Sequence, residues 1–301
     1  MKSNKLITVI GPTAIGKTAF SIELAKHFSS EILSSDSRQF YKEMNIGTAV
    51  PSKEELLSVK HHFIQNRSIF EDYSVGAFEN DALNLLNDLF KKQPVVVMVG
   101  GSGLYVDAVL KGLDDFPKVD PQIREGLKIK LKNEGIEVLQ QQLKELDPLS
   151  YGKMDVYNQQ RLIRALEICI AQGKPYSHYL GLHTKKRSFE SIKIGLTADR
   201  QVIYDRINHR VDLMMEKGLL EEAHSLYAHK HLNALQTVGY RELFAHFDGL
   251  ISLEEAINEI KKNTRRFAKR QGTWFRRDPE ITWFDYKTSP NDIINFVERL
   301  L

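Results

Sequence analysis

Short apolar segments alternate with longer segments of helical periodicity through the first third of the chain. The segment 95–99 is an unbroken apolar run, as expected of a strand that is covered on both faces of a sheet. Alternation of this kind predicts an α/β fold built on a parallel sheet. The strands predicted in this part are 5–10, 31–35 and 95–99, and the helices are 18–28 and 74–90.

The strand pattern is interrupted between about residues 120 and 190, where segments with helical periodicity and polar outer faces replace it. We therefore predict a parallel-sheet core formed by 1–119 and 191–301, with a mostly helical insertion domain at 120–190. The later elements are predicted as helices at 122–133, 136–146, 158–172 and 252–271, strands at 192–196 and 281–284, and a last helix from Pro290.

Composition excludes several classes of protein. With 42% hydrophobic and 27% charged residues, the chain of 301 residues can form a large core and is neither disordered nor fibrous. No apolar run approaches the roughly 18 residues of a membrane span, and the stretch at 6–10 is too short for a signal-peptide core. We expect a cytoplasmic protein.

The single Cys169 excludes an internal disulfide and a cysteine-based zinc site, so a metal would be held by oxygen.

Positive charge is concentrated near the C-terminal end. The net charge is +3, yet the segment 259–277 alone carries eight Lys or Arg and one Glu. Aromatic residues interleave with these cations, which suits a folded polyphosphate such as RNA. Trp274 and Phe275 either stack on bases or anchor the helix, and we favour packing in the core. At helical spacing the cations form two rows, Arg265 with Lys269 and Arg266 with Arg270.

The segment from Gly11 to Thr18 matches the phosphate-loop pattern G-x-x-x-x-G-K-[ST] and lies between a predicted strand and a predicted helix. Glycines in such a turn let backbone N–H groups close around phosphate oxygens, and the helix N-terminus adds positive potential. Lys17 would reach the outer phosphates, and the hydroxyl of Thr18 would ligate Mg²⁺. The sequence therefore predicts a site for a phosphate chain.

Acidic residues near this loop bear on the type of reaction. A nucleotide hydrolase would place an acid at the end of a second apolar strand, but the strand at 95–99 ends in Gly100-Gly101-Ser102-Gly103. A transferase that holds a leaving phosphate group is favoured. Asp36 follows the second strand at the edge where ligands of open α/β sheets gather. It is interpreted as a general base or an indirect magnesium partner, with a turn or capping role as the structural alternative.

Two further patterns leave alternatives open. Gln160, Arg161 and Arg164 share one face of the helix predicted at 158–172, which is either a solvated charged face or a surface for phosphates and base edges. The glycines after 95–99 allow a ligand to approach and Ser102 offers a hydroxyl, although such a turn can be purely structural.

These residues together resemble the bacterial-type tRNA dimethylallyltransferases, also called tRNA isopentenyltransferases. The resemblance runs from Ile10 to about Arg277 and is far more specific than the phosphate loop alone. It implies a P-loop core with a helical insertion and magnesium-dependent transfer of a dimethylallyl group from dimethylallyl diphosphate to N6 of adenosine 37. The segments that carry it are GPTAIGKT, DSRQ with Tyr41, His61-His62, YSVGAF, GGSGLY, NQQRLIRAL, GLLEE, VGYRE and TRRFAKRQGTWFR.

The resemblance implies a role for each matching residue. Asp36 would accept the N6 proton, and Arg206 or Arg210 would add charge at the diphosphate beside the catalytic Lys17 and Thr18. The residues expected to hold the diphosphate are Gly11, Thr13, Ala14, Ile15, Gly16, Lys17 and Thr18, with Thr18 also at the metal. Those expected to contact the tRNA anticodon stem-loop are Asp36, Ser37, Arg38, Gln39, Ser102, Arg124, Gln160, Arg161, Leu162, Ile163, Arg164, Lys269 and Arg270.

The expected substrates are tRNAs that read codons beginning with U, and diphosphate is released. The resemblance implies a monomer that needs no membrane and no obligate protein partner. Three positions depart from the family pattern: Ser102 stands where threonine is usual, Gln159 where many relatives have proline, and Gln65 where an aspartate often follows the paired histidines.

Two alternatives to tRNA modification differ in the acceptor or in the reaction. An adenylate isopentenyltransferase acting on free AMP, ADP or ATP would share the phosphate loop and the allyl chemistry. The helical insertion and the basic segment favour RNA, because a mononucleotide needs no extended cationic surface. From another class, a small-molecule kinase or an RNA-binding P-loop protein without transferase activity would share only the loop.

Overall fold

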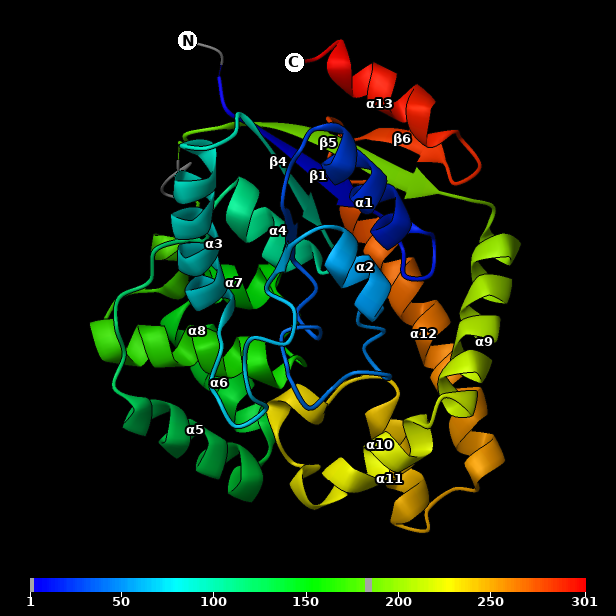
Figure 1. Ribbon diagram of the computed structural model, residues 1–301. Coiled ribbons are helices and arrows are strands. Elements are labelled where there is room, and N and C mark those ends of the chain that lie inside the picture. Colours follow the sequence, from blue (N-terminus) through cyan, green and yellow to red (C-terminus); the bar gives the residue numbers. More distant parts are fainter. Residues whose placement is uncertain (1–2, 182–185) are drawn as a thin grey trace. The chain divides into compact units, whose positions relative to one another are not determined.

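A sheet of parallel strands forms the centre of the larger part of the protein. The computed structural model describes residues 3–181 and 186–301. The strands are β1 (Lys5–Ile10), β2 (Ile32–Ser34), β3 (His61–His62), β4 (Val95–Val99), β5 (Glu190–Thr197) and β6 (Thr282–Asp285). Within the described residues these six lie in the order β3-β2-β4-β1-β5-β6, and each pair of neighbours is parallel (Figure 1). The α/β fold with a parallel sheet is confirmed.

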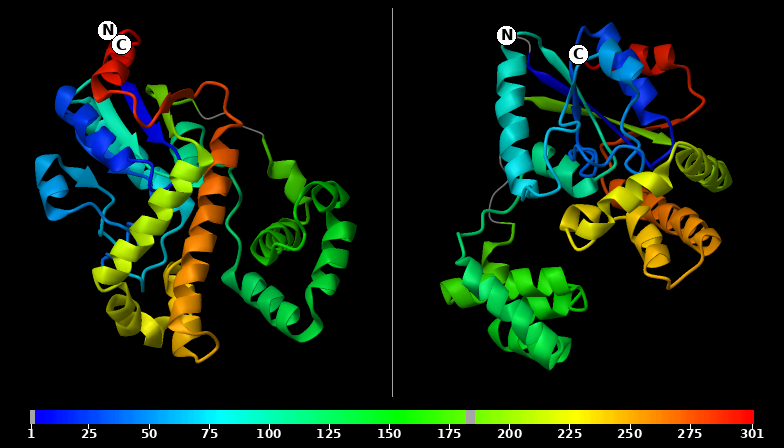
Figure 2. Two further views of the ribbon diagram at one scale, coloured as in Figure 1. Left: turned by 90° about the vertical axis from the view of Figure 1, so that its right-hand side faces the viewer. Right: turned by 60° about the horizontal axis from the view of Figure 1, so that its bottom comes forward.

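Helices cover both faces of this sheet. The helices of the core unit are α1 (Lys17–His27), α2 (Lys53–Ser58), α3 (Val75–Phe90), α4 (Gly103–Leu110), α9 (Arg200–Glu216), α10 (Leu219–Leu226), α11 (Tyr240–Phe247), α12 (Leu253–Phe275) and α13 (Pro290–Glu298). Because side chains alternate along a strand, β4 sends Val96 and Met98 into the apolar cluster with α3, α4 and α12, and Val97 into the cluster with α1 and α13. Figure 2 shows α1 and α13 side by side.

The chain divides into two compact units. Met1–Lys111 with Arg187–Leu301 form the core unit just described, and Gly112–Lys186 form a helical unit. The helices of the second unit are α5 (Pro121–Glu134), α6 (Ile136–Leu146), α7 (Pro148–Lys153) and α8 (Gln159–Gln172). They bury their own apolar cluster, which includes Leu139 and Leu166. The side chain of Asp120 accepts a hydrogen bond from the N–H of Gln122 at 2.9 Å and so caps α5.

Some elements differ from those expected. The edge strand β3 has two residues, too few to give a periodic pattern. Helix α12 continues four residues past the predicted end at Gln271, because Phe275 is 3% exposed and its burial outweighs the poor helix propensity of Gly272. No helix in the described part of the chain is long and apolar enough to cross a membrane.

Candidate active site

The loop from Gly11 to Gly16 has the backbone shape of a phosphate-binding turn. Gly11, Ala14 and Gly16 have φ values of 144°, 64° and 111°. A Cβ on Gly11 would lie 2.5 Å from the carbonyl oxygen of Leu196 in β5, so the close approach of the two strands requires glycine there. Helix α1 begins directly after the loop, which puts its free N–H groups at the loop mouth. Ile15 is 2% exposed, so only its backbone can meet a ligand.

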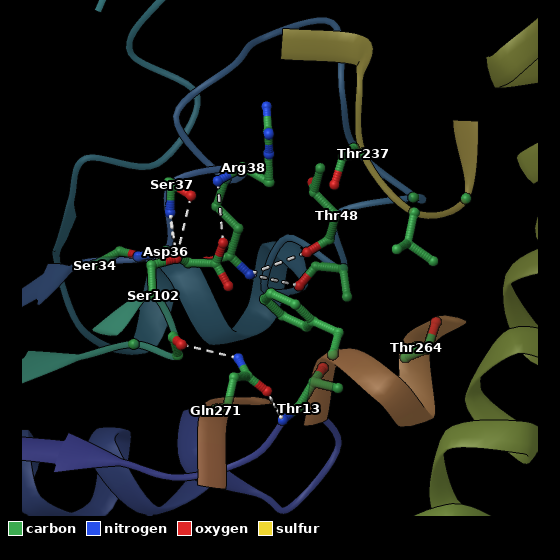
Figure 3. A pocket seen from close by; sticks show the side chains of 18 of the residues that line it. Thr13, Ser34, Asp36, Ser37, Arg38, Thr48, Ser102, Thr237, Thr264 and Gln271 are labelled. Atoms are coloured by element: carbon green, nitrogen blue, oxygen red, sulfur yellow. Dashed lines mark hydrogen bonds between the residues drawn. The ribbon is translucent and has the colours of Figure 1, made fainter. Parts of the chain in front are cut away.

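One cavity of about 520 Å³ in the core unit brings together ten of the predicted residues (Figure 3). This volume is typical of small-molecule sites. The predicted residues that line it are Thr13, Lys17, Thr18, Asp36, Ser37, Arg38, Gln39, Ser102, Arg210 and Arg270. Gly11, Ala14, Ile15, Gly16, Arg206 and Lys269 belong to the core unit but are not lining residues, and the other predicted residues belong to the helical unit.

Two cations, Lys17 and Arg210, line the cavity beside the phosphate loop. The ammonium of Lys17 donates to the carbonyl oxygen of Pro12 at 2.8 Å. Burial lowers the pKa of Lys17 to about 8, and the negative charge of Asp36 offsets part of that shift. Arg210, from α9, donates through Nη1 to the hydroxyl of Thr13 at 3.4 Å. Burial also lowers the pKa of Arg210, again opposed by Asp36.

Arg206 has a different environment from Arg210. Its Nε donates to the carbonyl oxygen of Ala14 at 2.7 Å, and its guanidinium lies 5.4 Å from the ring centre of Tyr286. Arg206 therefore supports the backbone of the loop, whereas Arg210 lines the cavity. The sequence left these two arginines as alternatives.

Asp36 lies directly after β2, on the cavity wall. One carboxylate oxygen, Oδ1, accepts from the backbone N–H of Arg38 at 3.1 Å, and the N–H of Asp36 donates to the hydroxyl of Ser34 at 3.3 Å. The turn role considered from the sequence is therefore real, and it fixes the side chain. Because the same carboxylate influences both Lys17 and Arg210, it lies within electrostatic reach of the phosphate loop.

Hydrogen bonds fix the polar side chains beside Asp36. The hydroxyl of Ser102 lies 3.1 Å from that of Ser37 and accepts from the Ser37 N–H at 3.2 Å. The amide of Gln39 accepts from Ser34 and donates to the carbonyl oxygens of Thr48 and Ala49 at 3.3 and 2.9 Å. Figure 3 labels Ser34, Ser37, Thr48 and Ser102 among the residues that line the cavity. Gln39 thus orders a wall of the cavity, and any contact with a substrate adds to that role.

The predicted residues of α8 divide between surface and core. Gln160 and Arg161 are exposed. Leu162 and Ile163 are 0% and 8% exposed in the apolar cluster of the helical unit, so their side chains cannot contact RNA and the prediction for them is wrong. Leu162 and Ile163 were included because they lie within the matched segment NQQRLIRAL. Only their position around the helix distinguishes them from the exposed residues beside them.

The arginines of the helical unit are fixed by a buried carboxylate. Glu167 is 2% exposed and accepts from Nε and Nη2 of Arg124 at 2.6 and 2.9 Å. Arg164 donates to the same carboxylate, and its guanidinium lies 5.2 Å from the ring centre of Phe116. Both guanidiniums remain partly exposed, with side-chain exposures of 48% and 38%. They present oriented donors to the surface.

Of the two aromatic residues at the end of α12, Phe275 packs in the core, as favoured from the sequence, whereas Trp274 is partly buried and also lines the cavity. Phe275 is buried, and the indole of Trp274 donates to Oδ2 of Asp107 at 2.8 Å. Lys269 and Arg270 are exposed on the same helix. His62 pairs with Glu31, and His61 bonds the carbonyl oxygen of Val59.

A carboxylate without a role in the sequence analysis supports the wall that contains Thr48 and Ala49. Glu222 accepts from three consecutive N–H groups, those of residues 45, 46 and 47, at 3.1, 2.8 and 2.9 Å, and from the hydroxyl of Tyr240 at 2.7 Å. Burial raises the pKa of Tyr240, which keeps its hydroxyl a donor. Glu222 lies in GLLEE and Tyr240 in VGYRE, but no spacing rule connects them to residues 45–47.

Replacing Glu222 with glutamine is expected to lower the free energy of unfolding by about 1–3 kcal/mol, because an amide NH₂ would face N–H groups that need an acceptor. Denaturant unfolding measures the effect. The adjacent Glu221 is exposed, so Glu221→Gln is the matched control and should change stability little. Equal stability of both variants would show that the carboxylate does not support the loop.

A parallel sheet with a phosphate loop after β1 and a cation-lined cavity at its carboxyl edge defines a P-loop α/β protein. A family model described as IPP transferase matches residues 39–278. The chain is 61% identical over 296 residues to the tRNA dimethylallyltransferase of Christiangramia forsetii, with 98% of each chain covered. It is 58% identical over 298 residues to that of Flavobacterium johnsoniae, with 97% of this chain and 96% of the relative covered. The chain belongs to the IPP transferase family and is a transferase.

Solved structures of the same kind share the fold. The tRNA isopentenylpyrophosphate transferase of Bacillus halodurans has a TM-score of 0.73 at 38% identity, covering 98% of this chain and 96% of that one. A eukaryotic dimethylallyltransferase acting on tRNA has a TM-score of 0.81 at 26% identity, covering 99% of this chain and 78% of that one. The resemblance noted in the sequence is confirmed, and nothing in these comparisons favours the free-nucleotide alternative.

Proposed function

We propose that the protein transfers the dimethylallyl group of dimethylallyl diphosphate to N6 of adenosine 37 in tRNAs that read codons beginning with U, releasing diphosphate. Prenyl transfer to tRNA is the activity for which its relatives are named. The observation that carries the finer proposal is that one cavity holds Lys17, Arg210 and Asp36. Two cations suit a leaving diphosphate, and a carboxylate suits the amine that replaces it.

The donor half of the reaction uses the phosphate loop. As the allylic C–O bond breaks, negative charge develops on the bridging oxygen. Loop N–H groups, Lys17 and Arg210 lie where they stabilise that charge without rearranging. Arg210 from α9 lines the same cavity and lies against Thr13 of the loop, so its guanidinium can add charge at a diphosphate held there.

The donor set around the diphosphate fits Mg²⁺. The hydroxyl of Thr18 and the carboxylate of Asp36 line the same cavity, and both are hard oxygen ligands. No group of three or more His, Cys, Asp or Glu among the described residues could hold a metal alone. We propose that Thr18 holds the ion, with the remaining ligands from diphosphate and water as Mg²⁺ prefers. Such an ion supplies charge neutralisation at the leaving group.

The acceptor half of the reaction uses Asp36. The exocyclic amine of adenine is a weak nucleophile, and a positioned carboxylate that takes its proton as the new C–N bond forms strengthens it. Ser37 and Ser102 offer hydroxyls beside Asp36, where they can bond the adenine edge. The base must leave the anticodon-loop stack to reach this point, at a cost of a few kcal/mol that contacts elsewhere offset.

Those contacts are proposed to come from exposed cations. Lys269 and Arg270 lie on α12, and Arg124, Arg161 and Arg164 on the helical unit. Guanidiniums preoriented by Glu167 suit phosphate oxygens of the anticodon stem. Because the substrate is a tRNA, we place the reaction in the cytoplasm.

Label transfer tests the proposal. Labelled dimethylallyl diphosphate and Mg²⁺ are offered with unmodified tRNA that carries adenosines at positions 36 to 38, and in parallel with AMP, ADP and ATP. We expect label in the tRNA, and none when adenosine 37 is replaced. Label in a free nucleotide, or label that persists without adenosine 37, would refute the proposed acceptor.

The pKa of Lys17 predicts a pH effect on the donor. The ammonium, with a pKa of about 8, is charged below that pH and loses its charge above it. The KM for dimethylallyl diphosphate is therefore expected to rise as the pH passes through 8. In Lys17→Arg the guanidinium stays charged, so this rise should disappear. Parallel KM profiles of the two enzymes would exclude Lys17 as the titrating group.

A further inference from the structure

We propose that Gln271 is a positioning residue. It fixes the site of the allylic diphosphate relative to the site of the adenine that accepts the allyl group. Its amide joins the phosphate loop to residues 100–103, here called the acceptor loop because it carries Ser102. Oε1 of Gln271 accepts from the N–H of Thr13 at 2.9 Å, and Nε2 donates to the carbonyl oxygen of Gly101 at 3.0 Å (Figure 3). The inference rests on the proposed function, which assigns diphosphate to one loop and adenine to the other.

The chemistry of this bridge requires an amide. Gln271 is 6% exposed, so water does not replace lost hydrogen bonds readily. One end must accept from an N–H and the other must donate to a carbonyl oxygen. A carboxylate would set an oxygen against the carbonyl of Gly101, and an aliphatic side chain would leave both backbone groups without this partner.

The shape of the acceptor loop is matched to the bridge. A Cβ on Gly101 would overlap Nε2 of Gln271, and a Cβ on Gly103 would overlap the indole of Trp274. The two side chains are three residues apart on α12 and so share one face. The acceptor loop is therefore pressed against α12 at two successive points, and its glycines are explained by this contact.

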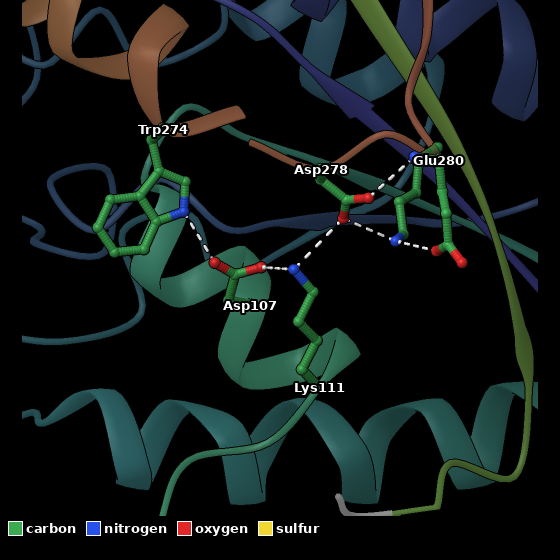
Figure 4. A network of polar contacts seen from close by, with 6 residues as sticks. Asp107, Lys111, Trp274, Asp278 and Glu280 are labelled. Carbon is green, nitrogen blue, oxygen red and sulfur yellow. Dashed lines mark hydrogen bonds and ion pairs between the residues drawn. The ribbon is translucent and has the colours of Figure 1, made fainter. Parts of the chain in front are cut away.

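A polar network fixes Trp274, and with it the end of α12. Asp107 accepts from the indole and also pairs with Lys111 at 3.1 Å (Figure 4). Lys111 lies 3.3 Å from Asp278, which pairs with Lys193 of β5 at 2.8 Å. Because the helix end is tied to α4 and to β5, the amide of Gln271 has little freedom to follow a displaced loop.

The relative position of the phosphate loop and the acceptor loop matters because the reaction joins two separately bound substrates. The breaking C–O bond is held through the phosphate loop, and the attacking amine is held beside Ser102 and Asp36. Small misplacement of reacting atoms lowers the rate of the chemical step. Loss of the bridge should therefore lower kcat as well as weaken diphosphate binding, whereas a remote packing defect would change stability alone.

The test is a double-mutant cycle on the full chain. Gln271→Ala and Gly101→Ala are each expected to lower kcat/KM for dimethylallyl diphosphate about tenfold, the first by removing the amide and the second by displacing it. The double variant should be no worse than Gln271→Ala, since the clash has gone. Losses that multiply would overturn the proposal, as would single variants with wild-type values.

Calorimetry with inorganic diphosphate and Mg²⁺ supplies a readout that needs no turnover. Gln271→Ala should weaken this binding, and Gln271→Glu should weaken it further because it adds negative charge without changing the size of the side chain. If Gln271→Ala does not fold, the affinity of Gln271→Glu for diphosphate, compared with that of the wild type, tests the proposal. Binding by Gln271→Glu equal to wild type would overturn the proposal.

Gln201→Ala is the matched control. Gln201 is an exposed glutamine of α9 that bonds Asp205, and wild-type kinetics are expected. A wild-type enzyme that neither binds diphosphate nor prenylates tRNA would refute the proposed function instead. An active wild type with multiplicative losses in the cycle refutes only the role of Gln271.

Discussion

Replacing Asp36 with asparagine is expected to lower kcat for tRNA prenylation about 10²- to 10⁴-fold, the usual contribution of a positioned general base. Asparagine keeps an oxygen that can accept from the N–H of Arg38, so the turn after β2 is retained. It cannot take the N6 proton. Single-turnover transfer of labelled dimethylallyl groups measures the chemical step directly.

Binding data separate this role from a structural one. The variant should keep its melting temperature and its affinity for tRNA. Asp88→Asn, an exposed carboxylate of α3 paired with Lys91, is the control and should keep full activity. Turnover of Asp36→Asn within about tenfold of wild type would be below the range for general-base catalysis and would leave the carboxylate with its turn role only.

Loss of the Arg210 guanidinium is expected to lower kcat/KM for dimethylallyl diphosphate about 10²- to 10³-fold, as removal of a preorganised charge at the developing anion does. Arg210 lines the cavity and lies within reach of Asp36 and the phosphate loop. Steady-state kinetics of Arg210→Met at saturating tRNA provide the measurement. Arg210→Lys should recover part of the loss, because lysine restores the positive charge but lacks the paired N–H groups of the guanidinium.

Arg206→Met is the matched control for this variant. Arg206 comes from the same helix, one turn earlier, and bonds the loop backbone instead of facing the cavity. Its removal should cost about tenfold or less, in line with one lost hydrogen bond. Equal losses in the two variants, or a larger loss for Arg206→Met, would reverse the assignment made from the structure.

The pattern of apolar and polar residues predicted those helices and strands in which burial decides which positions are apolar. The run at 95–99 is apolar because β4 is buried on both faces, and α8 was expected because its apolar residues repeat along one face. The structure adds the caps of α8, Asn158 at its start and the left-handed Gly173 at its end. The P-loop was predicted because its function demands glycines at fixed spacing.

Residues whose roles depend on distant partners could not be predicted. Glu222 accepts from the N–H groups of residues 45–47, and Gln271 bonds Thr13 and Gly101. These partners are far apart in the sequence, whereas helix and strand periodicity relates only residues that are close in the sequence. Leu162 was misassigned because a matched segment does not distinguish the outer face of a helix from its core. The catalytic role of Asp36 and the tRNA contact of Ser102 stay predictions.

The order of segments in the sequence has a consequence for synthesis on the ribosome. The phosphate loop emerges early, but its partner Gln271 follows Thr13 by 258 residues, after the whole helical unit and β5. Strand β1 can pair with β4 long before it pairs with β5. A nascent chain therefore displays the loop before α12, whose residues Thr264, Arg270 and Gln271 line the cavity. The cavity is therefore complete only in chains that extend through α12.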